Sequence, residues 1–378
     1  MGKKIHPKPP KQQPKPKPRP QAPKPVAAAV AAPTVADLLP FALQQRILAT
    51  FGAAFAPVLN SDSLPSLLQE VKAALYARDF DAAFARASPE ALDAYAARWS
   101  PTRALAYAAV LAGVEEHLAE VLVLVDREAG AGCEGDDDDG AAEKQEDSLA
   151  QTPAKSIKMI SIGGAAAEIA ALAAWLSTTE PAVSGSVTLL DSAPWSSVVT
   201  KLHDALTSPP PLSKYASAAA RASNTPLLAP SRLASTFSQS DVLSLDRAGL
   251  SATLGSDPVL VTLLFTLNEL YTSAGVGKTT TFLHDLSAVA PAGTLLLVVD
   301  SPGSYSEAAV GKVSKKYPMQ WLLDHTLLKD EKPVEGCLWD KVESHDSVWF
   351  RLAETLHYPI ALENMRYQMH LYRASRPS

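Results

Sequence analysis

The sequence predicts an α/β protein in which a parallel, doubly wound sheet follows an all-helical region and a basic tail. Three observations lead to this prediction. Apolar residues recur with a period of 3.6 between residues 35 and 125. From residue 156 onward, short apolar runs alternate with helical patterns, as they do in parallel sheets covered by helices on both faces. Before residue 33, lysine and proline alternate and offer little to bury.

The length and charge of the chain set further limits. Its 378 residues, 47% of them hydrophobic, leave room for two domains of about 150 residues each. The formal net charge of -6 hides an uneven distribution, because residues 1–25 hold eight Lys or Arg and no acid. The rest of the chain has 26 basic and 40 acidic residues, so we expect a cationic tail on an acidic body.

Cysteine usage and hydropathy narrow the class of protein. Cys133 and Cys337 are the two cysteines of the sequence, too few for a zinc ribbon or a disulfide framework, which favours a reducing compartment. The sequence has no apolar run of about 20 residues and no signal-like N-terminus. We therefore expect a soluble protein that is not secreted and has no membrane contact.

Residues 1–33 are expected to be a disordered Lys/Pro-rich tail. Alternating Lys and Pro favour an extended polyproline II backbone. Two interpretations stay open. The tail either contacts nucleic-acid phosphates or acts in nuclear import, or it only keeps the protein soluble.

Residues 34–125 are expected to form a helical N-terminal region. The 3.6-residue period predicts helices that we list by range: 35–55, 67–76, 80–84, 89–99 and 102–125. Ser88 before Pro89 and Ser100 before Pro101 are predicted to be N-caps. Residues 68–80 combine an apolar face with a basic edge, which indicates core packing, with RNA or partner docking as the alternative.

Residues 126–155 are expected to be an acidic flexible linker. They include four consecutive aspartates at 136–139, which suggest a metal site at first sight. Hard cations need ligands spaced around a turn, whereas adjacent residues of a flexible segment point in all directions. We therefore predict a solvated linker and no metal.

Residues 156–378 are expected to form one sheet domain. Apolar runs predict five parallel strands, at 158–162, 187–190, 233–237, 259–267 and 294–299. An antiparallel pair at 349–352 and 362–372 is expected to close the sheet. In open parallel sheets, ligands bind outside the carboxyl ends of the strands, so the residues that follow each strand are the candidates for function.

The first three strand exits predict a nucleotide cofactor. Gly163 and Gly164 follow the first strand, where glycine allows a tight turn and a close approach to a ligand. Asp191 ends the second strand and is placed to bind ribose hydroxyls, an arrangement that serves NAD and S-adenosylmethionine alike. The third strand is followed by residues suited to adenine, one carboxylate and one backbone N–H, which favours S-adenosylmethionine; the residues are Gln239, Asp241 and Val242.

A rival motif lies further along the chain. Gly275 to Thr279 end like a phosphate-binding loop, and the apolar run 295–300 resembles the strand and acid that hold magnesium in NTPases. The full motif requires glycine where Thr272 stands, and Asn268 to Ser273 separate it from its strand. A P-loop NTPase is therefore kept as an alternative.

Several long strings resemble the fungal 25S ribosomal RNA uridine-N3 methyltransferases. They are residues 95–101, 209–215, 265–271, 299–307 and 316–325. The resemblance spans about residues 38–373. It implies a class I, Rossmann-like methyltransferase sheet, S-adenosylmethionine as cofactor, and methylation of a uridine N3 in large-subunit rRNA. It also implies ribosomal RNA or the pre-ribosomal large subunit as partner, a role in ribosome biogenesis, and residence in the nucleus and nucleolus.

Methylation at uracil N3 requires removal of the imide proton, which suggests roles for residues after the fourth and fifth strands. The hypothesis is that Glu269 or Asp300 accepts the proton while Asn268 or Tyr305 orients the uracil edge. The competing interpretation is structural, with Glu269 capping a helix and Asp300 fixing a turn.

Two later segments have candidate contacts with RNA. Tyr317 and Trp321 are candidates for stacking a base, although core packing is the simpler interpretation. Residues 366–373 alternate and are predicted to place four side chains on one face, which is either an RNA-facing edge or an ordinary half-exposed strand: Arg366, Gln368, His370 and Tyr372.

A third reading is a non-catalytic ribosome-assembly factor with a degenerate cofactor fold. It rests on the alanines at 165–167 in place of a richer glycine loop.

If the basic tail anchors RNA, deleting residues 1–25 should weaken RNA binding and flatten its salt dependence, because fewer counterions are released. The affinity for S-adenosylmethionine should not change. RNA binding measured over a range of salt concentrations checks this, and an unaltered salt slope would assign the tail to solubility.

Overall fold

The structure, a computed structural model, describes Gly2 and residues 38–124, 154–164, 166–303, 305–310, 313–328 and 338–375. Residues Pro33–Ser378 form one compact unit. The expected basic tail and residues 126–153 of the expected linker lie outside the described residues.

The 3.6-residue period before the sheet forms helices, as predicted. They are α1 (Phe41–Ala54), α2 (Ala56–Leu59), α3 (Leu64–Tyr76), a π-helical turn (Asp81–Ala85), α4 (Pro89–Arg98), α5 (Ser100–Gly113) and α6 (Glu115–Leu118). The predicted Ser88 cap is confirmed, since its side chain accepts a hydrogen bond from the Ala91 N–H at 3.1 Å. The prediction for Ser100 is wrong. Ser100 is the buried first residue of α5, which follows α4 after Trp99 alone.

The predicted alternation of strands and helices is confirmed. The strands of the large sheet are β1 (Val123–Leu124), β2 (Lys155–Ile162), β3 (Val183–Asp191), β4 (Leu233–Gln239), β5 (Leu260–Leu264), β6 (Leu295–Asp300), β9 (Leu338–Phe350) and β10 (Met365–Ser375). The later helices are α7 (Ala167–Thr178), α8 (Ser196–Thr207), α9 (Ala218–Ala222), α10 (Arg247–Leu254), α11 (Leu267–Ser273), α12 (Gly275–Val289) and α13 (Met319–Leu327).

The order of the strands is β4-β3-β2-β5-β6-β10-β9, with the short β1 paired to the start of β2. The first five strands in this order run parallel to one another. Strand β10 lies between β6 and β9 and is antiparallel to both. The order reverses at β2, which has β3 on one side and β5 on the other. This reversal is the switch point at which such sheets bind ligands.

Several boundaries differ from the prediction: the helix expected at 102–125 ends at Gly113, and β3 starts at Val183 rather than at residue 187. The strand expected at 259–267 ends at Leu264, because the backbone turns at Phe265 and α11 starts at Leu267. Strand β9 starts at Leu338, well before the expected Trp349. It is an edge strand with many exposed polar residues, so it lacks the apolar run by which the inner strands are recognised. A hairpin of β7 (Tyr305–Val310) and β8 (Val313–Pro318) was not predicted.

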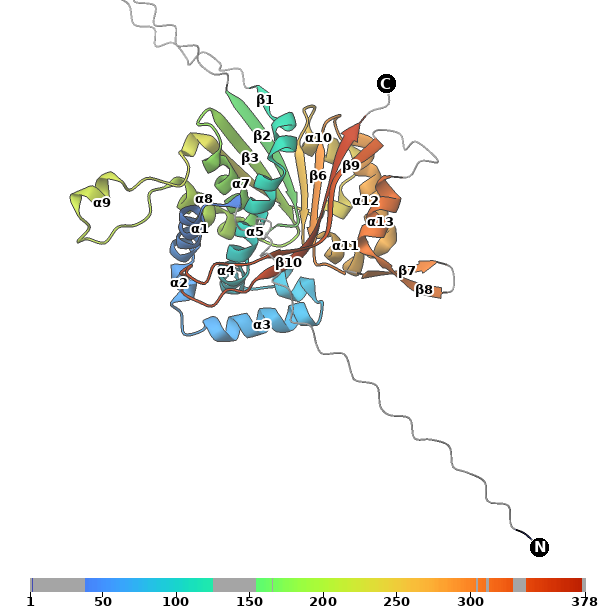
Figure 1. The fold of residues 1–378 in the computed structure, drawn as a ribbon, viewed down its shortest axis with the longest axis horizontal. Coiled ribbons are helices and arrows are strands. Elements are labelled where there is room, and N and C mark those ends of the chain that lie inside the picture. The colour runs from blue at the N-terminus through green and yellow to red at the C-terminus, as the bar shows by residue number, and fades with distance from the viewer. Residues whose placement is uncertain are drawn as a thin grey trace, which may run out of the picture. The chain divides into compact units, whose positions relative to one another are not determined.

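Helices cover both faces of the sheet (Figure 1). In β6, Leu295, Leu297 and Val299 point into a core shared with α5, α7 and α8, while Leu296 and Val298 point into a core shared with α10, α12 and α13. This alternation follows from the two-residue period of a strand. Because both faces are buried, the inner strands are apolar throughout.

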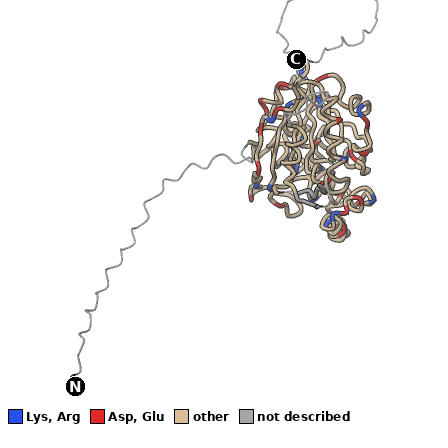
Figure 2. Tube along the Cα trace, turned by 90° about the vertical axis from the view of Figure 1, so that its right-hand side faces the viewer, with Lys and Arg blue, Asp and Glu red and all other residues tan. Residues whose placement is uncertain are grey.

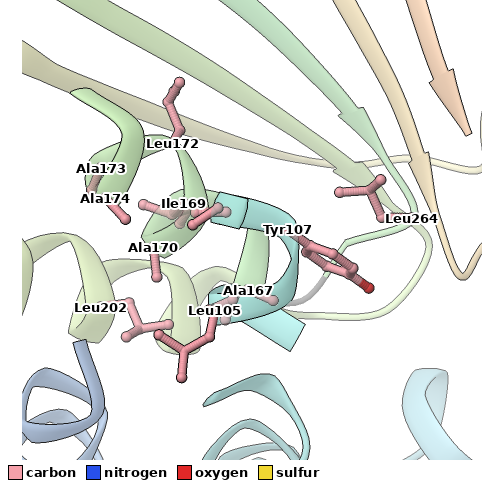
Figure 3. Close-up of a cluster of buried hydrophobic side chains, with 14 of the residues drawn as sticks. Leu105, Tyr107, Ala167, Ile169, Ala170, Leu172, Ala173, Ala174, Leu202 and Leu264 are labelled. Atoms are coloured by element: carbon pink, nitrogen blue, oxygen red, sulfur yellow. The ribbon is translucent and has the colours of Figure 1, made fainter. Parts of the chain in front are cut away.

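The N-terminal helices belong to one of these two layers. Figure 3 shows Leu105 of α5 beside Ala170 of α7 and Leu202 of α8, all of them buried. The small side chains of α7 allow this close approach. Tyr107 of α5 extends toward Leu264 of β5, and both border a small apolar cavity between α5 and the sheet.

The β9–β10 loop also joins the helical region to the sheet. The Gln45 side chain donates to the His357 carbonyl and accepts from the His357 N–H, each at 2.9 Å. The Tyr358 hydroxyl donates to the Ala97 carbonyl at 2.7 Å, and Arg98 forms an ion pair with Glu363 at 2.7 Å. The loop therefore fastens α1 and α4 to the last two strands.

Charged residues of both signs are interspersed along the periphery of the described body (Figure 2). In the part of the chain that the structure describes, no helix is long and apolar enough to cross a membrane. Within that same part, no group of three or more His, Cys, Asp or Glu residues is arranged to hold a metal ion.

If α5 is a structural layer of the sheet, Leu105→Ala should lower the free energy of unfolding of the whole unit by about 2–5 kcal/mol, since it leaves a cavity at a fully buried position. Urea unfolding followed by circular dichroism and by tryptophan fluorescence should give one shared transition. Leu124→Ala, at a position that is 63% exposed, is the control and should change little. Two separate transitions would show that the helical region folds independently.

Candidate active site

A pocket lies at the carboxyl ends of β2, β3, β4 and β5, where the sheet topology predicts it. It contains about 740 Å³ of space not filled by protein atoms, part of it open to solvent. Six of the residues that were predicted from strand exits line it: Gly163, Gly164, Asp191, Asp241, Val242 and Glu269. The strand exits in the sequence therefore identify residues that line the sheet side of the pocket.

The two glycines of the first loop are required by close packing. Gly163 has φ +68°, and a Cβ there would lie 2.3 Å from Thr266 Cγ2. The Thr266 hydroxyl donates to the Gly163 carbonyl at 2.7 Å, which joins the exits of β2 and β5. A Cβ on Gly164 would lie 2.8 Å from the Cδ atom of Glu168. A side chain at Gly163 would displace the loop, whereas one at Gly164 would require the Glu168 and Ser161 side chains to shift.

The exits of β3 and β4 form the next part of the rim. One carboxylate oxygen of Asp191 accepts from the Ala193 N–H at 2.7 Å. Asp241 accepts from the Leu243 N–H at 2.9 Å and leads into a short 3₁₀ turn at Val242. The Gln239 amide donates to the Ser192 carbonyl at 3.1 Å and is not among the lining residues. Gln239 thus ties the two exits together from outside the pocket.

The N-terminal helical region forms a wall of the pocket that sequence reasoning missed. Its lining residues are Phe84, Tyr95, Ser100 and Arg103. Tyr95 packs edge-on against Phe84, with ring centroids 4.9 Å apart, and both rings lie 5.6 Å from that of Trp195. The string 95–101 was noticed only for its resemblance to a family. The apolar residues of α4 and α5 are the signal that the sequence offers, but they do not distinguish a pocket wall from a core.

Arg103 is the only Lys or Arg among the lining residues that the structure describes. Its guanidinium donates to the Tyr95 hydroxyl and lies 5.1 Å above the ring centroid of Phe265. These contacts hold the cation in place between the helical wall and the exit of β5. Burial lowers the pKa of Arg103, but the hydroxyls of Tyr95 and Tyr107 and the nearby Glu168 outweigh this effect and raise it above its ordinary value.

Three carboxyl groups around Arg103 have raised pKa values. Burial raises the pKa of Glu168 to about 7, against the opposing effect of backbone hydrogen bonds and Arg103. Burial also raises the pKa of Asp191 to about 6. The pKa of Glu269 rises to about 8, first through burial and then through the negative charges of Asp191 and Asp300. The ligand-free pocket therefore holds protons that a cation would displace.

Phe265 occupies a strained conformation at the end of β5. Its φ is +60°, in the left-handed region that a bulky residue rarely adopts, at a cost of about 1–3 kcal/mol. Its N–H donates to the Val299 carbonyl at 2.7 Å, which holds the turn against β6. This turn directs the chain into α11 and places Glu269 in the pocket.

Two of the other predicted catalytic residues, Asp300 and Asn268, are not among the lining residues. Asp300 is 1% exposed and is not part of the lining, and its two oxygens accept from the N–H groups of Asn268 and Ser301 at 2.9 and 2.7 Å. The half-buried Asn268 is also absent from the lining. Tyr305 starts β7, and its side chain lies outside the described residues.

The structure gives the rival motif no support. Gly275 to Thr279 form the first turn of α12, after α11 rather than after a strand, and Lys278 is exposed on that turn. No phosphate-binding loop forms in this segment.

The interpretation of residues 366–373 as an exposed strand is also wrong for three of the four side chains. Gln368, His370 and Tyr372 share a face as predicted but are buried, because β10 lies inside the sheet. Only Arg366 is exposed.

The fold and the pocket together define a class I, S-adenosylmethionine-dependent methyltransferase. Four carboxyl groups and one guanidinium line the site, which suits a ligand with two positive charges and one carboxylate. Glu168 is 3% exposed, and its Oε2 has no hydrogen-bond partner among the described residues. The nearby Ser161 hydroxyl is likewise without one there. These unsatisfied groups beside the glycine loop fit a polar ligand.

Comparisons with known proteins agree with this class. A family model for SAM-dependent methyltransferases matches residues 51–373, and the chain belongs to that family. The chain is 33% identical over 330 residues to the 25S rRNA (uridine(2843)-N(3))-methyltransferase of Saccharomyces cerevisiae, covering 82% of this chain and 78% of the yeast protein.

Two solved structures are more distant. An O-methyltransferase family protein from Burkholderia thailandensis is 13% identical, with a TM-score of 0.31, over 59% of this chain and 52% of that one. A SAM-dependent methyltransferase from Methanosarcina mazei is 10% identical, with a TM-score of 0.30, over 57% of this chain and 91% of that one.

Binding of S-adenosylmethionine should release protons, because a cationic ligand favours the ionised forms of Glu168, Asp191 and Glu269. The affinity should therefore fall as the pH drops from 8 to 6, where these carboxyl groups become protonated. Titration calorimetry in buffers of different ionisation enthalpy measures the number of protons released.

Glu168→Gln should release about half a proton fewer at pH 7, where a group with a pKa near 7 is half protonated. The exposed Glu116→Gln is the matched control and should behave as the unaltered protein. Equal proton release by the protein and by Glu168→Gln would contradict the assignment of Glu168 to the cofactor.

Proposed function

We propose that this protein transfers a methyl group from S-adenosylmethionine to N3 of a uridine in large-subunit ribosomal RNA. The observation that carries the proposal is the extent of the match to the yeast uridine-N3 methyltransferase, which includes both the helical wall and the sheet side of the pocket. The acidic pocket supports it, because it contains a carboxyl group suited to removing an imide proton.

In this proposal, different lining residues bind different parts of the cofactor. Asp191 would accept hydrogen bonds from the ribose hydroxyls, and Asp241 with the Val242 N–H would bind adenine. The Gly163–Gly164 backbone would face the methionine part, whose carboxylate would pair with Arg103 and whose amino group would pair with Glu168. Bound S-adenosylmethionine supplies a methyl group on a cationic sulfur. The task left to the chain is to align uracil and remove its N3 proton.

Glu269 is the proposed proton acceptor. It lines the pocket at the first turn of α11, and its raised pKa brings its titration close to neutral pH, where a general base is most effective. As a carboxylate, Glu269 takes the N3 proton as the nitrogen becomes nucleophilic. Asp300 has a supporting role in this proposal, because it holds the N–H of Asn268 and so fixes the start of the helix that carries Glu269.

The same proposal places the protein in the nucleus and nucleolus, where large-subunit rRNA is made and assembled. The pre-ribosomal large subunit is the proposed partner, with the basic N-terminal tail as an anchor on RNA. The division of the chain into tail, helical region, linker and methyltransferase sheet belongs to this proposal as well.

Glu269→Gln should reduce methyl transfer at saturating S-adenosylmethionine by about 10²–10⁴-fold, because the amide cannot accept a proton. The substrate is large-subunit rRNA from cells that lack the enzyme, and nucleoside mass spectrometry measures the 3-methyluridine that the variant forms in it. In the unaltered protein, kcat/KM should rise with pH up to about 8, since the carboxylate is the active form.

Glu116→Gln, at an exposed position of α6, should retain full activity. Full methylation by Glu269→Gln would exclude Glu269 as the base. Cofactor binding without any change in the nucleosides of the rRNA would instead favour a non-catalytic assembly factor.

A further inference from the structure

An exposed tryptophan contacts two arginines near the end of β9 and the start of β10. We call Trp349, Arg351 and Arg366 the tryptophan–arginine cluster. Trp349 is 48% exposed, and the guanidinium carbons of both arginines lie 5.6 Å from its ring centroid. This distance is within the range of a cation–π contact. Both arginines are themselves exposed.

The cluster is held on the sheet and therefore has a defined geometry. Trp349 and Arg366 are directly opposed in the β9–β10 pairing, so their side chains share one face. The Arg366 Nε–H donates to the Ser347 hydroxyl at 2.8 Å. The next residue, Phe350, is fully buried in the opposite core and fixes the end of β9. Little ordering is left for a ligand to impose.

The two arginines lack acidic partners among the described residues, as do the exposed Arg46, Arg78 and Arg221, but only Arg351 and Arg366 share one exposed indole there. Four exposed or half-buried arginines form ion pairs with carboxylates: Arg86, Arg98, Arg247 and Arg373. Neither Arg351 nor Arg366 forms an ion pair with a carboxylate of the described residues. Two positive charges held at one indole repel each other, and an anionic ligand would relieve that repulsion.

The register of the sheet places the cluster at the same edge as the active site. Gln368 of β10 pairs with Asp300, the last residue of β6. Arg366, two residues earlier on an antiparallel strand, therefore lies beyond the end of β6. Strand β9 is two strands from β6, about 10 Å away at the usual spacing. The cofactor residues Asp191 and Asp241 lie on the other side of the pocket, at the ends of β3 and β4.

We propose that the tryptophan–arginine cluster binds single-stranded RNA next to the target nucleotide. This inference rests on the proposed function, which it extends by naming how the substrate is held. An indole offers a stacking surface to any base, and guanidinium groups bind the phosphates on either side. The target uridine enters the pocket from the side of β6, and the neighbouring nucleotides lie over β10 and β9.

The test measures binding of full-length protein to a fluorescently labelled, unstructured 20-nucleotide oligouridine. Trp349→Ala should weaken binding about 10-fold, and Trp349→Phe should restore most of it, because a base stacks on either ring. In Arg351→Ala/Arg366→Ala, the slope of log affinity against log salt should decrease by about 1.4, the value for two phosphate contacts on a single strand.

Two control variants remove side chains that match the cluster residues in exposure or in charge. Phe41→Ala removes an aromatic side chain of nearly equal exposure, 47%, at the start of α1. Arg86→Ala removes an exposed arginine that is already paired with Asp81. Both should leave oligouridine binding unchanged.

In rRNA methylation, the cluster variants should raise KM for RNA and leave kcat and S-adenosylmethionine affinity unchanged. Oligouridine affinity equal to that of the unaltered protein, in variants that bind the cofactor normally, would overturn the inference even if methylation proceeds. Loss of binding to an oligoglutamate peptide instead of oligouridine would overturn it in favour of an acidic protein partner. Cluster-dependent RNA binding without any methylation would uphold the inference and contradict the proposed function.

Discussion

The packing of α5 against α7 and the sheet is the contact on which the rest of the structure depends. A parallel sheet of apolar strands must be covered on both faces, and on the face that carries α7 and α8 there is room beside α7 for a further helix over β5 and β6. Helix α5 fills this space, with Tyr107 close to Leu264 of β5. The same helix starts at Ser100 and carries Arg103 one turn later. Its packing on the sheet therefore covers the core and also places residues of the pocket wall.

The charge of the pocket depends on the protonation of its carboxyl groups. A helical wall supplies one cation, and the strand exits supply carboxyl groups that burial keeps partly protonated. The carboxyl groups of such a site carry less negative charge when it is free than when a cation is bound. The positive charge of the ligand causes the carboxyl groups to ionise. Without the ligand, partial protonation lowers the free-energy cost of burying several carboxyl groups. Glu269 titrates in the same environment, which couples the state of the proposed base to the presence of the cofactor.

Sequence reasoning could predict the parts of this protein that depend on local pattern. Apolar runs on both faces identify the inner strands, and the residues that follow them identify Gly163, Asp191 and Glu269 as neighbours. It could not predict Arg103, because the contact between α5 and the sheet joins segments that lie far apart in the chain. Edge strand β9 was missed over most of its length for a related reason, since half-exposed strands lack a continuous apolar run. Gln368 and His370 were misplaced because polar residues on an inner strand look like those of a surface strand. In the structure they form a buried hydrogen-bonded pair at 3.1 Å.

The position of β10 has a consequence for biosynthesis. Its residues, Met365–Ser375, follow the other described strands in the chain, yet they lie between β6 and β9 rather than at the rim of the sheet. While the chain is still emerging from a ribosome, β6 presents a bare apolar edge, and the β9–β10 loop is not yet complete to clamp α1 and α4. Unpaired edges of this kind invite association with other chains. The sheet therefore cannot close before β10 has emerged, and a nascent copy depends on protection of the β6 edge until then.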